Sequence, residues 1–169
     1  ALCWCIIGQQ INLTFAYSLK RRLTEAYGSK IEYESKNYWL FPEPEAISKL
    51  KPDDLRIFQF SQKKAEYVIE AGKQFSEGNI SKEILSRLAT DEAIKKLTSI
   101  RGIGEWTANY LLMKSLRRHE CITHGDVGLF NALVKLKNFQ KRPEKQQILD
   151  LFAHYPGWEA YLVFYLWRS

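Results

Sequence analysis

The chain has 169 residues, is 46% hydrophobic and carries a formal net charge of +6. This composition excludes an intrinsically disordered chain and indicates one to one and a half average globular domains, while the positive charge suits a polyanionic partner. The longest apolar run, residues 160–167, is far shorter than the roughly twenty residues that a membrane-spanning helix needs.

Helical periodicity dominates the first half of the chain. One helix is predicted to end at Gly28, and its apolar face consists of Ala16, Leu19, Leu23 and Tyr27. Residues 29–43 are aromatic and irregular. Pro44 then begins a short helix that continues to residue 50, and another short helix begins at residue 52 or 53.

Hydroxyl side chains are predicted to cap the next three helices, because they can accept hydrogen bonds from amides of the first turn. Ser61 precedes a longer helix with the apolar residues Ala65, Val68, Ile69, Gly72 and Phe75. Ser81 and Thr90 precede the two helices that follow.

The second half of the chain is helical as well. One helix ends near Arg117 and has the apolar residues Ala108, Leu111, Leu112 and Leu116. The next helix begins at Asp126 and has the apolar residues Val127, Phe130, Leu133 and Val134. Two more helices cover residues 145–153 and 158–168. Strand signals are weak, so we predict an all-α bundle of nine or ten helices without internal repeats or a clear interdomain linker.

Two glycines spaced one residue apart interrupt the segment Leu97-Thr98-Ser99-Ile100-Arg101-Gly102-Ile103-Gly104-Glu105-Trp106-Thr107-Ala108. A short helix precedes them and an apolar helix follows at once. Such glycines allow a tight turn with exposed N–H groups at a helix N-terminus, where the macrodipole favours an anion. This turn can therefore hold a phosphate without reading a base. An ordinary helix–helix turn explains the glycine spacing equally well.

Asp126 follows the turn Thr123-His124-Gly125 and precedes an apolar helix, so it can cap that helix at its N-terminus, a role worth about 1 kcal/mol. A carboxylate in this place can also face a cleft, and the two roles do not exclude each other. His124 can serve as a second catalytic group or only as a local hydrogen-bonding residue.

The cysteines do not suggest a metal centre. Three cysteines are an odd number, which argues against a disulfide framework. Cys121 lies between His119 and His124, but no second cluster supplies the fourth ligand of a structural zinc. Cys3 and Cys5 near the beginning of the chain are interpreted, like Cys121, as buried or inert thiols.

Taken together, the motifs resemble the helix-hairpin-helix DNA glycosylases with a Gly/Pro-rich loop and a catalytic Asp (HhH-GPD), in the branch of 3-methyladenine DNA glycosylase II. The resemblance rests on the hairpin 97–110, the Gly125-Asp126 loop, the opening segment 7–11 and the aromatic closing helix from Trp158. It makes residues 1–169 one catalytic region, with the helix-hairpin-helix at about 91–116 and the catalytic loop at about 121–128. The family's β-rich amino-terminal domain does not match any part of this sequence, so we expect either that an upstream segment is missing or that the protein belongs to a shorter branch.

The resemblance implies a role for each matching residue. Asp126 is the catalytic carboxylate. Amides of Gly102, Gly104 and Thr107 hold a DNA phosphate. Backbone carbonyls of Thr98, Ile100 and Gly102 bind a structural Na⁺ or K⁺, and no other cofactor is required.

Further residues match positions that surround the damaged nucleotide in the family. Gln9 and Gln10 fill the gap that the flipped base leaves, although from the sequence alone they are polar residues interrupting a first helix. Tyr110 and Trp167 line the base pocket, with Trp106 and Trp158 as further candidates. Without the resemblance these rings would be assigned to the core.

The implied reaction is the hydrolysis of the N-glycosidic bond of alkylated purines, of the 3-methyladenine or 7-methylguanine type, after base flipping. Bifunctional relatives carry a lysine where this chain has Trp106, so we expect base excision without strand cleavage. The chain also lacks the four-cysteine cluster of the iron–sulfur relatives. Its partner would be damaged double-stranded DNA, bound by a monomer without a membrane, in the bacterial nucleoid and cytoplasm or the eukaryotic nucleus.

Two alternatives stay open. A helix-hairpin-helix module can bind DNA without chemistry, which would leave Asp126 and the pocket aromatics without a role. A glycosylase can also act on uracil, hypoxanthine or an oxidised purine. Two positions depart from the family: Arg101 stands where relatives usually have a proline, and Thr123-His124-Gly125 replaces a loop that often contains one.

Overall fold

The computed structural model describes residues 1–137 and 141–169, and these residues form eleven helices and one two-stranded sheet. The chain divides into two compact units. The first comprises residues 1–87 and 99–103, and the second comprises residues 88–98 and 104–169. In the part of the chain that the structure describes, no helix has both the length and the apolar character needed to cross a membrane.

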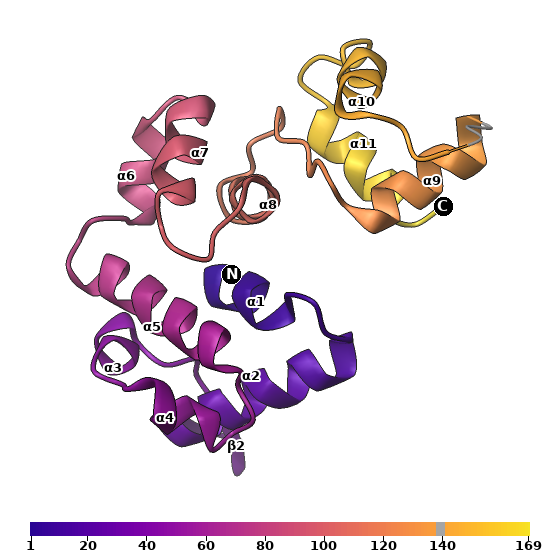
Figure 1. Cartoon of the computed structure of the whole chain (residues 1–169). Coiled ribbons are helices and arrows are strands. Elements are labelled where there is room, and N and C mark those ends of the chain that lie inside the picture. The colour runs from indigo at the N-terminus through magenta and orange to yellow at the C-terminus, as the bar shows by residue number, and fades with distance from the viewer. Residues whose placement is uncertain (138–140) are drawn as a thin grey trace. The chain divides into compact units, whose positions relative to one another are not determined.

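The first unit is built around a long central helix, α5 (Gln62–Ser76), which packs against α1, α3 and α4 (Figure 1). Its other helices are α1 (Leu2–Gly8), α2 (Leu13–Tyr27), α3 (Pro44–Ser48), α4 (Pro52–Arg56) and α6 (Lys82–Arg87). The core includes Leu19 and Leu23 of α2, Ile47 of α3 and Val68 of α5. These positions confirm the apolar faces predicted for α2 and α5.

The predicted helix beginnings at Pro44, residue 52 and Ser61 are confirmed. The Ser61 hydroxyl accepts a hydrogen bond from the Lys64 amide at 3.3 Å. The Ser81 hydroxyl likewise accepts from the Ile84 amide at 3.1 Å. These caps depend on neighbours only three residues away, which is why the sequence suffices to predict them.

The predicted cap at Thr90 is wrong. Helix α7 (Thr90–Thr98) already includes this residue, and the amide before it, that of Ala89, donates to the Glu92 carboxylate at 3.1 Å. The Thr90 hydroxyl donates instead to the carboxylate of Glu120. The Ala93 amide, which a cap at Thr90 could have served, donates instead to the Ala89 carbonyl at 2.9 Å.

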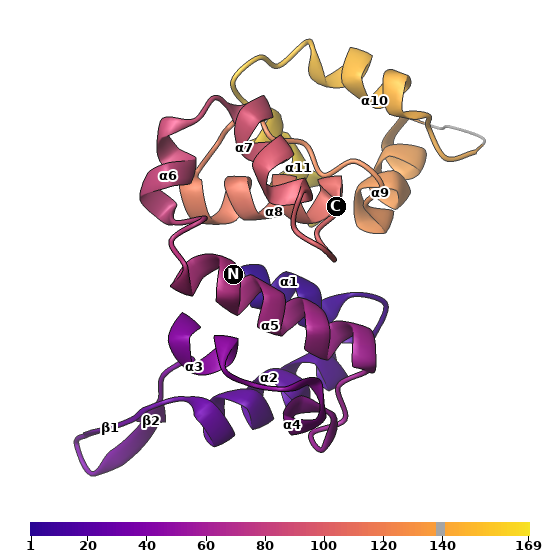
Figure 2. The same ribbon diagram turned by 60° about the vertical axis from the view of Figure 1, so that its left-hand side comes forward.

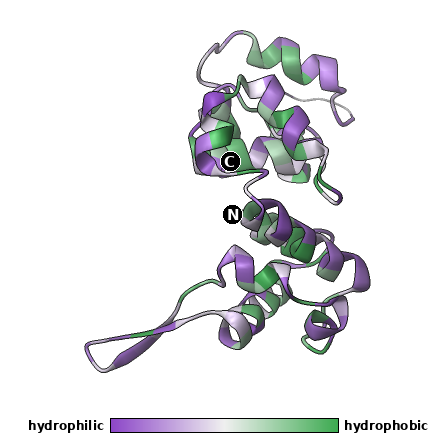
Figure 3. Ribbon diagram, turned by 90° about the vertical axis from the view of Figure 1, so that its left-hand side faces the viewer, coloured by the Kyte–Doolittle hydropathy of each residue, from purple (hydrophilic) through white to green (hydrophobic). Residues whose placement is uncertain are grey.

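The region 29–43, predicted as irregular, contains an antiparallel hairpin of β1 (Lys30–Tyr33) and β2 (Lys36–Trp39), in which Tyr33 pairs with Lys36. Its two turn residues, Glu34 and Ser35, have φ of 49° and 59°, as in the tight turns that join twisted strands. The hairpin extends away from the helices of its unit, and it is hydrophilic around its tip (Figures 2 and 3). All strand residues are exposed, so neither face imposes the apolar alternation by which a strand is predicted.

Gly28 ends α2 as predicted, but for a different reason. Its φ is −82°, which any residue can adopt, so no left-handed turn requires a glycine here. A Cβ atom at this position would lie 2.1 Å from the carbonyl oxygen of Leu40. The glycine is needed because the end of the hairpin returns so close to the end of the helix.

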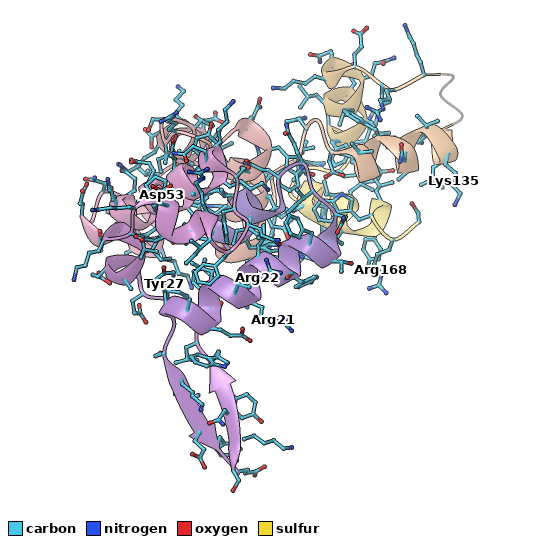
Figure 4. All side chains as sticks on the ribbon, turned by 60° about the horizontal axis from the view of Figure 1, so that its bottom comes forward. Arg21, Arg22, Tyr27, Asp53, Lys135 and Arg168 are labelled. Atoms are coloured by element: carbon cyan, nitrogen blue, oxygen red, sulfur yellow. The ribbon has the colours of Figure 1, made fainter. Side chains whose placement is uncertain are left out.

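Two side chains of α2 connect this helix to α4 and the loop after it. The Arg22 guanidinium donates to the Phe58 carbonyl at 3.2 Å, and the Tyr27 hydroxyl donates to the Asp54 carbonyl at 3.2 Å. Figure 4 labels both side chains along α2.

The second unit contains α7, α8 (Glu105–Leu116), α9 (Val127–Lys137), α10 (Lys145–Phe152) and α11 (Glu159–Leu166). Helix α8 ends at Arg117 in the left-handed conformation, with φ of 56°. Helix α9 packs against α11, and its buried residues are Leu129, Ala132 and Leu133. The prediction that Val127 belongs to the buried face is wrong: this first residue of α9 is 54% exposed.

Candidate functional site

Three N–H groups donate to the carboxylate of Asp126 from different parts of the second unit. Oδ1 accepts from the Leu129 amide and from Nε1 of Trp167, both at 2.8 Å. Oδ2 accepts from Nε1 of Trp106 at 2.9 Å. The bond to Leu129 confirms the predicted cap of α9. The two indole bonds show that this half-buried carboxylate also lies between aromatic side chains.

The aromatic rings beside Asp126 come from two helix termini and one helix interior. Trp106, in the first turn of α8, stacks on Tyr110 with centroids 5.1 Å apart and an interplanar angle of 19°. Tyr110 lies 6.0 Å from Trp167, which follows the last residue of α11. The three predicted pocket residues Trp106, Tyr110 and Trp167 therefore form one aromatic cluster with Asp126.

Trp158 does not belong to this cluster. It lies immediately before α11, whereas Trp167 lies immediately after it, and an eight-residue helix is about 12 Å long. Its ring lies 5.3 Å from that of Tyr161, and Tyr161 in turn lies 5.2 Å from His119. The structure therefore brings Trp158 together with Tyr161 and not with the other three predicted pocket residues.

Gly128 lies close to both the Asp126 carboxylate and the Trp167 ring. A Cβ atom there would lie 3.1 Å from Oδ1 of Asp126 and 3.3 Å from Cδ1 of Trp167. A larger residue would press on both groups. The glycine thus allows the Trp167 ring to approach the first turn of α9 and to reach the carboxylate.

His124 lies in the loop before Asp126, and its Nδ1 is buried without a hydrogen-bond partner among the described residues. Burial lowers the pKa of His124 from its usual 6.5, and the positive charge of Lys145 lowers it further, while Glu105 acts in the opposite direction. Lys145 and Glu105 are themselves paired at 2.8 Å. Burial and the charge of Lys145 therefore favour the neutral form of the imidazole.

This lowered pKa predicts a loss of stability in acid. Between the folded and the unfolded pKa the unfolded chain binds more protons, so the free energy of unfolding falls as the pH drops below about 6.5. Titration of the His124 ring by NMR should give a pKa below 6.5, and Glu105→Gln should lower it further. His124→Gln should remove this part of the acid sensitivity. A measured pKa at or above 6.5 would contradict the burial described here.

The glycine turn predicted to hold a phosphate is divided between the two units. In the first unit, Gly102 has φ of 90°, and a Cβ atom there would lie 2.3 Å from the ring of Tyr67. The Ile103 amide donates to the Ile100 carbonyl at 3.1 Å, which closes the turn. Glycine is required at position 102 for both its backbone conformation and its contact.

The rest of the motif begins α8 in the second unit. Gly104 is the N-cap residue, with φ of −93°, and a Cβ atom there would meet nothing within 4 Å. The first amides of a helix have no intrahelical partner, and Thr107 is the third residue of α8. The hydroxyl-bearing side chain of Thr107 is buried.

The carbonyl groups predicted to bind a cation differ in the bonds they already make. The Gly102 oxygen accepts from Nε2 of Gln9 at 3.0 Å, and the Ile100 oxygen accepts from the Ile103 amide. Each retains a second lone pair. Neutral oxygen atoms of this kind are suitable ligands for a hard cation.

The two glutamines predicted to fill the gap differ in the structure. Gln9 is partly buried, and its amide nitrogen donates to Gly102. Gln10 is exposed and has φ of 56°, an uncommon value for a residue other than glycine. Both follow α1, which ends at Gly8, so they do not interrupt a helix as the sequence alone suggested.

The cysteines are free thiols. Burial raises the pKa of Cys3 and of Cys5 to about 11 and that of Cys121 to about 12. Among residues 1–137 and 141–169, no group of three or more His, Cys, Asp or Glu side chains is arranged to hold a metal ion.

Sequence analysis missed the residues that hold the glycine turn in the first unit. Arg101 pairs with Glu66 at 3.2 Å, and its guanidinium lies 5.7 Å from the centre of the Tyr67 ring. Lys64 donates to backbone carbonyls at the end of α1. No sequence signal reveals these contacts, since each joins residues more than thirty positions apart.

Comparison with known proteins places the chain among repair proteins. Residues 3–155 match the family described as "HhH-GPD superfamily base excision DNA repair protein". A protein of Bacillus subtilis named DNA-3-methyladenine glycosylase is 45% identical over 168 residues, which are 99% of this chain and 55% of that protein. The chain thus spans about half the length of the curated relatives it matches first.

Two solved structures share the fold over 99% of this chain. One, a 3-methyladenine DNA-glycosylase from Archaeoglobus fulgidus, has a TM-score of 0.84, 28% identity and 56% of its own length covered. The other, the Schizosaccharomyces pombe 3-methyladenine DNA glycosylase Mag1 in complex with abasic DNA, has a TM-score of 0.82, 27% identity and 77% of its length covered.

Proposed function

We propose that this chain, which belongs to the HhH-GPD superfamily of base excision DNA repair proteins, is the catalytic region of a monofunctional DNA glycosylase that releases alkylated purines. Its substrate would be damaged double-stranded DNA, bound by a monomer. The observation that carries the proposal is the half-buried Asp126 carboxylate between the indoles of Trp106 and Trp167. The names of the Bacillus subtilis and Archaeoglobus fulgidus proteins support the same lesion class.

The two carboxylate oxygens of Asp126 accept different numbers of hydrogen bonds, which suggests a separate role for each. Oδ1 accepts two hydrogen bonds and is saturated, whereas Oδ2 accepts one, from Trp106. Oδ1 therefore fixes the carboxylate on α9, and Oδ2 retains a lone pair for the substrate. A carboxylate held in this way needs no reorganisation when positive charge develops beside it.

The reaction proposed for this carboxylate is a hydrolysis. The bond between C1′ and the base nitrogen breaks, and its electron pair neutralises the positive charge of the alkylated purine. The sugar becomes oxocarbenium-like, and the negative charge of Asp126 stabilises it. The oxygen of a water molecule then bonds to C1′, and Oδ2 accepts the proton that the water loses.

The aromatic cluster suits a cationic base. A purine alkylated on a ring nitrogen is positively charged, and aromatic faces attract such a charge by a cation–π interaction of about 0.5–2 kcal/mol. Trp106, Tyr110 and Trp167 supply these faces beside the carboxylate. Trp158 has no part in this pocket. Because the charged base is already a good leaving group, no dedicated general acid is required.

The proposed DNA contacts lie on the glycine turn and at the end of α1. Amides of Gly102, Gly104 and Thr107 would hold a phosphate, and the exposed Gln10, with Gln9 beside it, would fill the space of the everted nucleotide. Carbonyls of Thr98, Ile100 and Gly102 would hold a Na⁺ or K⁺, which would add positive charge for a phosphate oxygen.

The absence of strand cleavage follows from the residue at position 106. An amine is needed to attack C1′ and form a Schiff base, but this position carries an indole whose N–H donates to Asp126. The proposal therefore includes base release that leaves the sugar–phosphate backbone intact.

The function is tested by incubating the chain with methylated duplex DNA and identifying the released bases by mass spectrometry. We expect 3-methyladenine and 7-methylguanine, with abasic sites that break only after alkali treatment. Release of uracil, hypoxanthine or oxidised purines alone would correct the lesion class. Binding to abasic DNA without release of any base would show a DNA-binding module instead of an enzyme.

A further inference from the structure

The end of α1 is held by Lys64, a side chain to which the function proposed above gives no role. Lys64 extends from the first turn of α5, and its ammonium donates to the carbonyl oxygens of Ile7 and Gln9 at 2.5 Å each. The Ile6 oxygen lies 3.5 Å from the same nitrogen. Carbonyl groups at the end of a helix lack intrahelical partners, and a cation there also interacts favourably with the helix dipole.

The hydrogen-bonding capacity of this ammonium is already used within the protein. A lysine has three N–H donors, and three carbonyl oxygens surround it. Burial lowers the pKa of Lys64, and no carboxylate forms a salt bridge with it in the part of the chain that the structure describes. Lys64 is thus directed at the backbone of α1 rather than at solvent.

The backbone next to Lys64 adopts a conformation that needs support. Gln10 has φ of 56°, a left-handed conformation that is strained in a residue other than glycine. Such conformations persist where surrounding contacts enforce them. The bond from Lys64 to the Gln9 carbonyl fixes the peptide group immediately before Gln10, which leaves the Gln10 side chain exposed.

The same segment reaches the glycine turn within the first unit. The Gln9 side chain donates to the Gly102 carbonyl at 3.0 Å. On the other side of the turn, Arg101 pairs with Glu66, and Tyr67 packs against Gly102. Lys64, Glu66 and Tyr67 all belong to α5, so one helix contacts both the end of α1 and the turn.

We propose that Lys64 is a positioning residue that fixes Gln9 and Gln10. Through the Gln9 side chain it also fixes the glycine turn. The gap-filling and phosphate-holding elements of the first unit therefore act as one rigid piece. The proposal rests on the proposed function for the use of this piece on DNA. Its structural part, the coupling of the end of α1 to the turn, can be measured without DNA.

Amide hydrogen exchange of the whole chain tests the coupling. In Lys64→Met we expect the amides of Gln9 and Ile103 to exchange at least about tenfold faster. The segment at Gln9 loses the hydrogen bond from Lys64, and the turn that contains Ile103 loses the support of a fixed Gln9 side chain. In Gln9→Leu only the Ile103 amide should exchange faster. The Leu129 amide of the second unit serves as an internal reference, since global unfolding would accelerate it as well.

Two further variants test whether the effect depends on the position of Lys64 on α5 and on its positive charge. Lys73→Met removes an exposed lysine from the far end of α5 and should leave the exchange of Gln9 and Ile103 unchanged. Lys64→Arg keeps several N–H donors and should retain most of the protection. Unchanged exchange at Ile103 in Lys64→Met overturns the proposal, as does the same acceleration in Lys73→Met.

DNA binding tests how the rigid piece is used. The ratio of the dissociation constants for undamaged and abasic duplex should fall about tenfold in Lys64→Met, whereas in Lys73→Met it should stay at the native value. A loss of folded protein lowers both affinities together and leaves the ratio unchanged. If the native chain itself shows no preference for abasic DNA and releases no base, the proposed function fails, while the exchange result still decides the coupling.

Discussion

Asp126→Asn is expected to lower the single-turnover rate of base release by at least about 10²-fold, while the protein still folds and binds abasic duplex DNA. The carboxamide oxygen can replace Oδ1 and keep the bonds from Leu129 and Trp167. The carboxamide nitrogen then replaces Oδ2, so the site loses its negative charge and its proton acceptor. Rates are measured with enzyme in excess over methylated duplex.

A matched control separates this effect from the loss of a helix cap. Ser81→Ala removes the cap of α6, which is the same kind of hydrogen bond, in a helix without predicted site residues. It should cost about 1 kcal/mol of stability and leave the rate unchanged. A native rate in Asp126→Asn would remove this carboxylate from the chemistry, whatever its effect on stability.

Gly102→Ala is expected to have the second largest effect, a destabilisation of about 2–4 kcal/mol. The alanine must adopt φ near 90°, and its Cβ would lie 2.3 Å from the Tyr67 ring, at an atom close to the base of that side chain. The turn must therefore move, and its amides lose their arrangement. Thermal unfolding should occur about 5–15 °C lower, and the affinity for abasic duplex should fall.

Two variants test the stated cause of this loss. Gly104→Ala introduces the same methyl group where φ is −93° and nothing lies within 4 Å, so the melting temperature should hardly change. Tyr67→Ala in the Gly102→Ala background removes the clash and should restore part of the stability. Equal melting temperatures for Gly102→Ala and Gly104→Ala would show that the contact with Tyr67 is unimportant.

The sequence sufficed for features that depend on near neighbours. Pro44, Ser61 and Asp126 mark helix beginnings correctly because their effects act within one turn. The cluster of Trp106, Tyr110 and Asp126 followed from a resemblance in which the order of motifs is characteristic. Trp106 and Tyr110 lie one turn apart on α8, so their spacing along the chain already places the two rings on one face of that helix.

The sequence was insufficient to predict features that depend on long-range contacts or on the exposure of both faces of an element. The β-hairpin has two exposed faces, so it carries no apolar alternation. Trp158 has the same chemistry as Trp167, and only the position of α11 separates the two rings. Lys64 bonds to residues more than fifty positions away, and no local pattern distinguishes it from its neighbour Lys63.

The central claim is that the Asp126 carboxylate stabilises positive charge on the sugar of an everted nucleotide. It is tested most directly with two duplexes that differ only in one abasic-site mimic, a cationic pyrrolidine or a neutral tetrahydrofuran. We predict that the native chain binds the cationic mimic at least about tenfold more tightly and that Asp126→Asn loses this preference. The same preference in both proteins would contradict the claim.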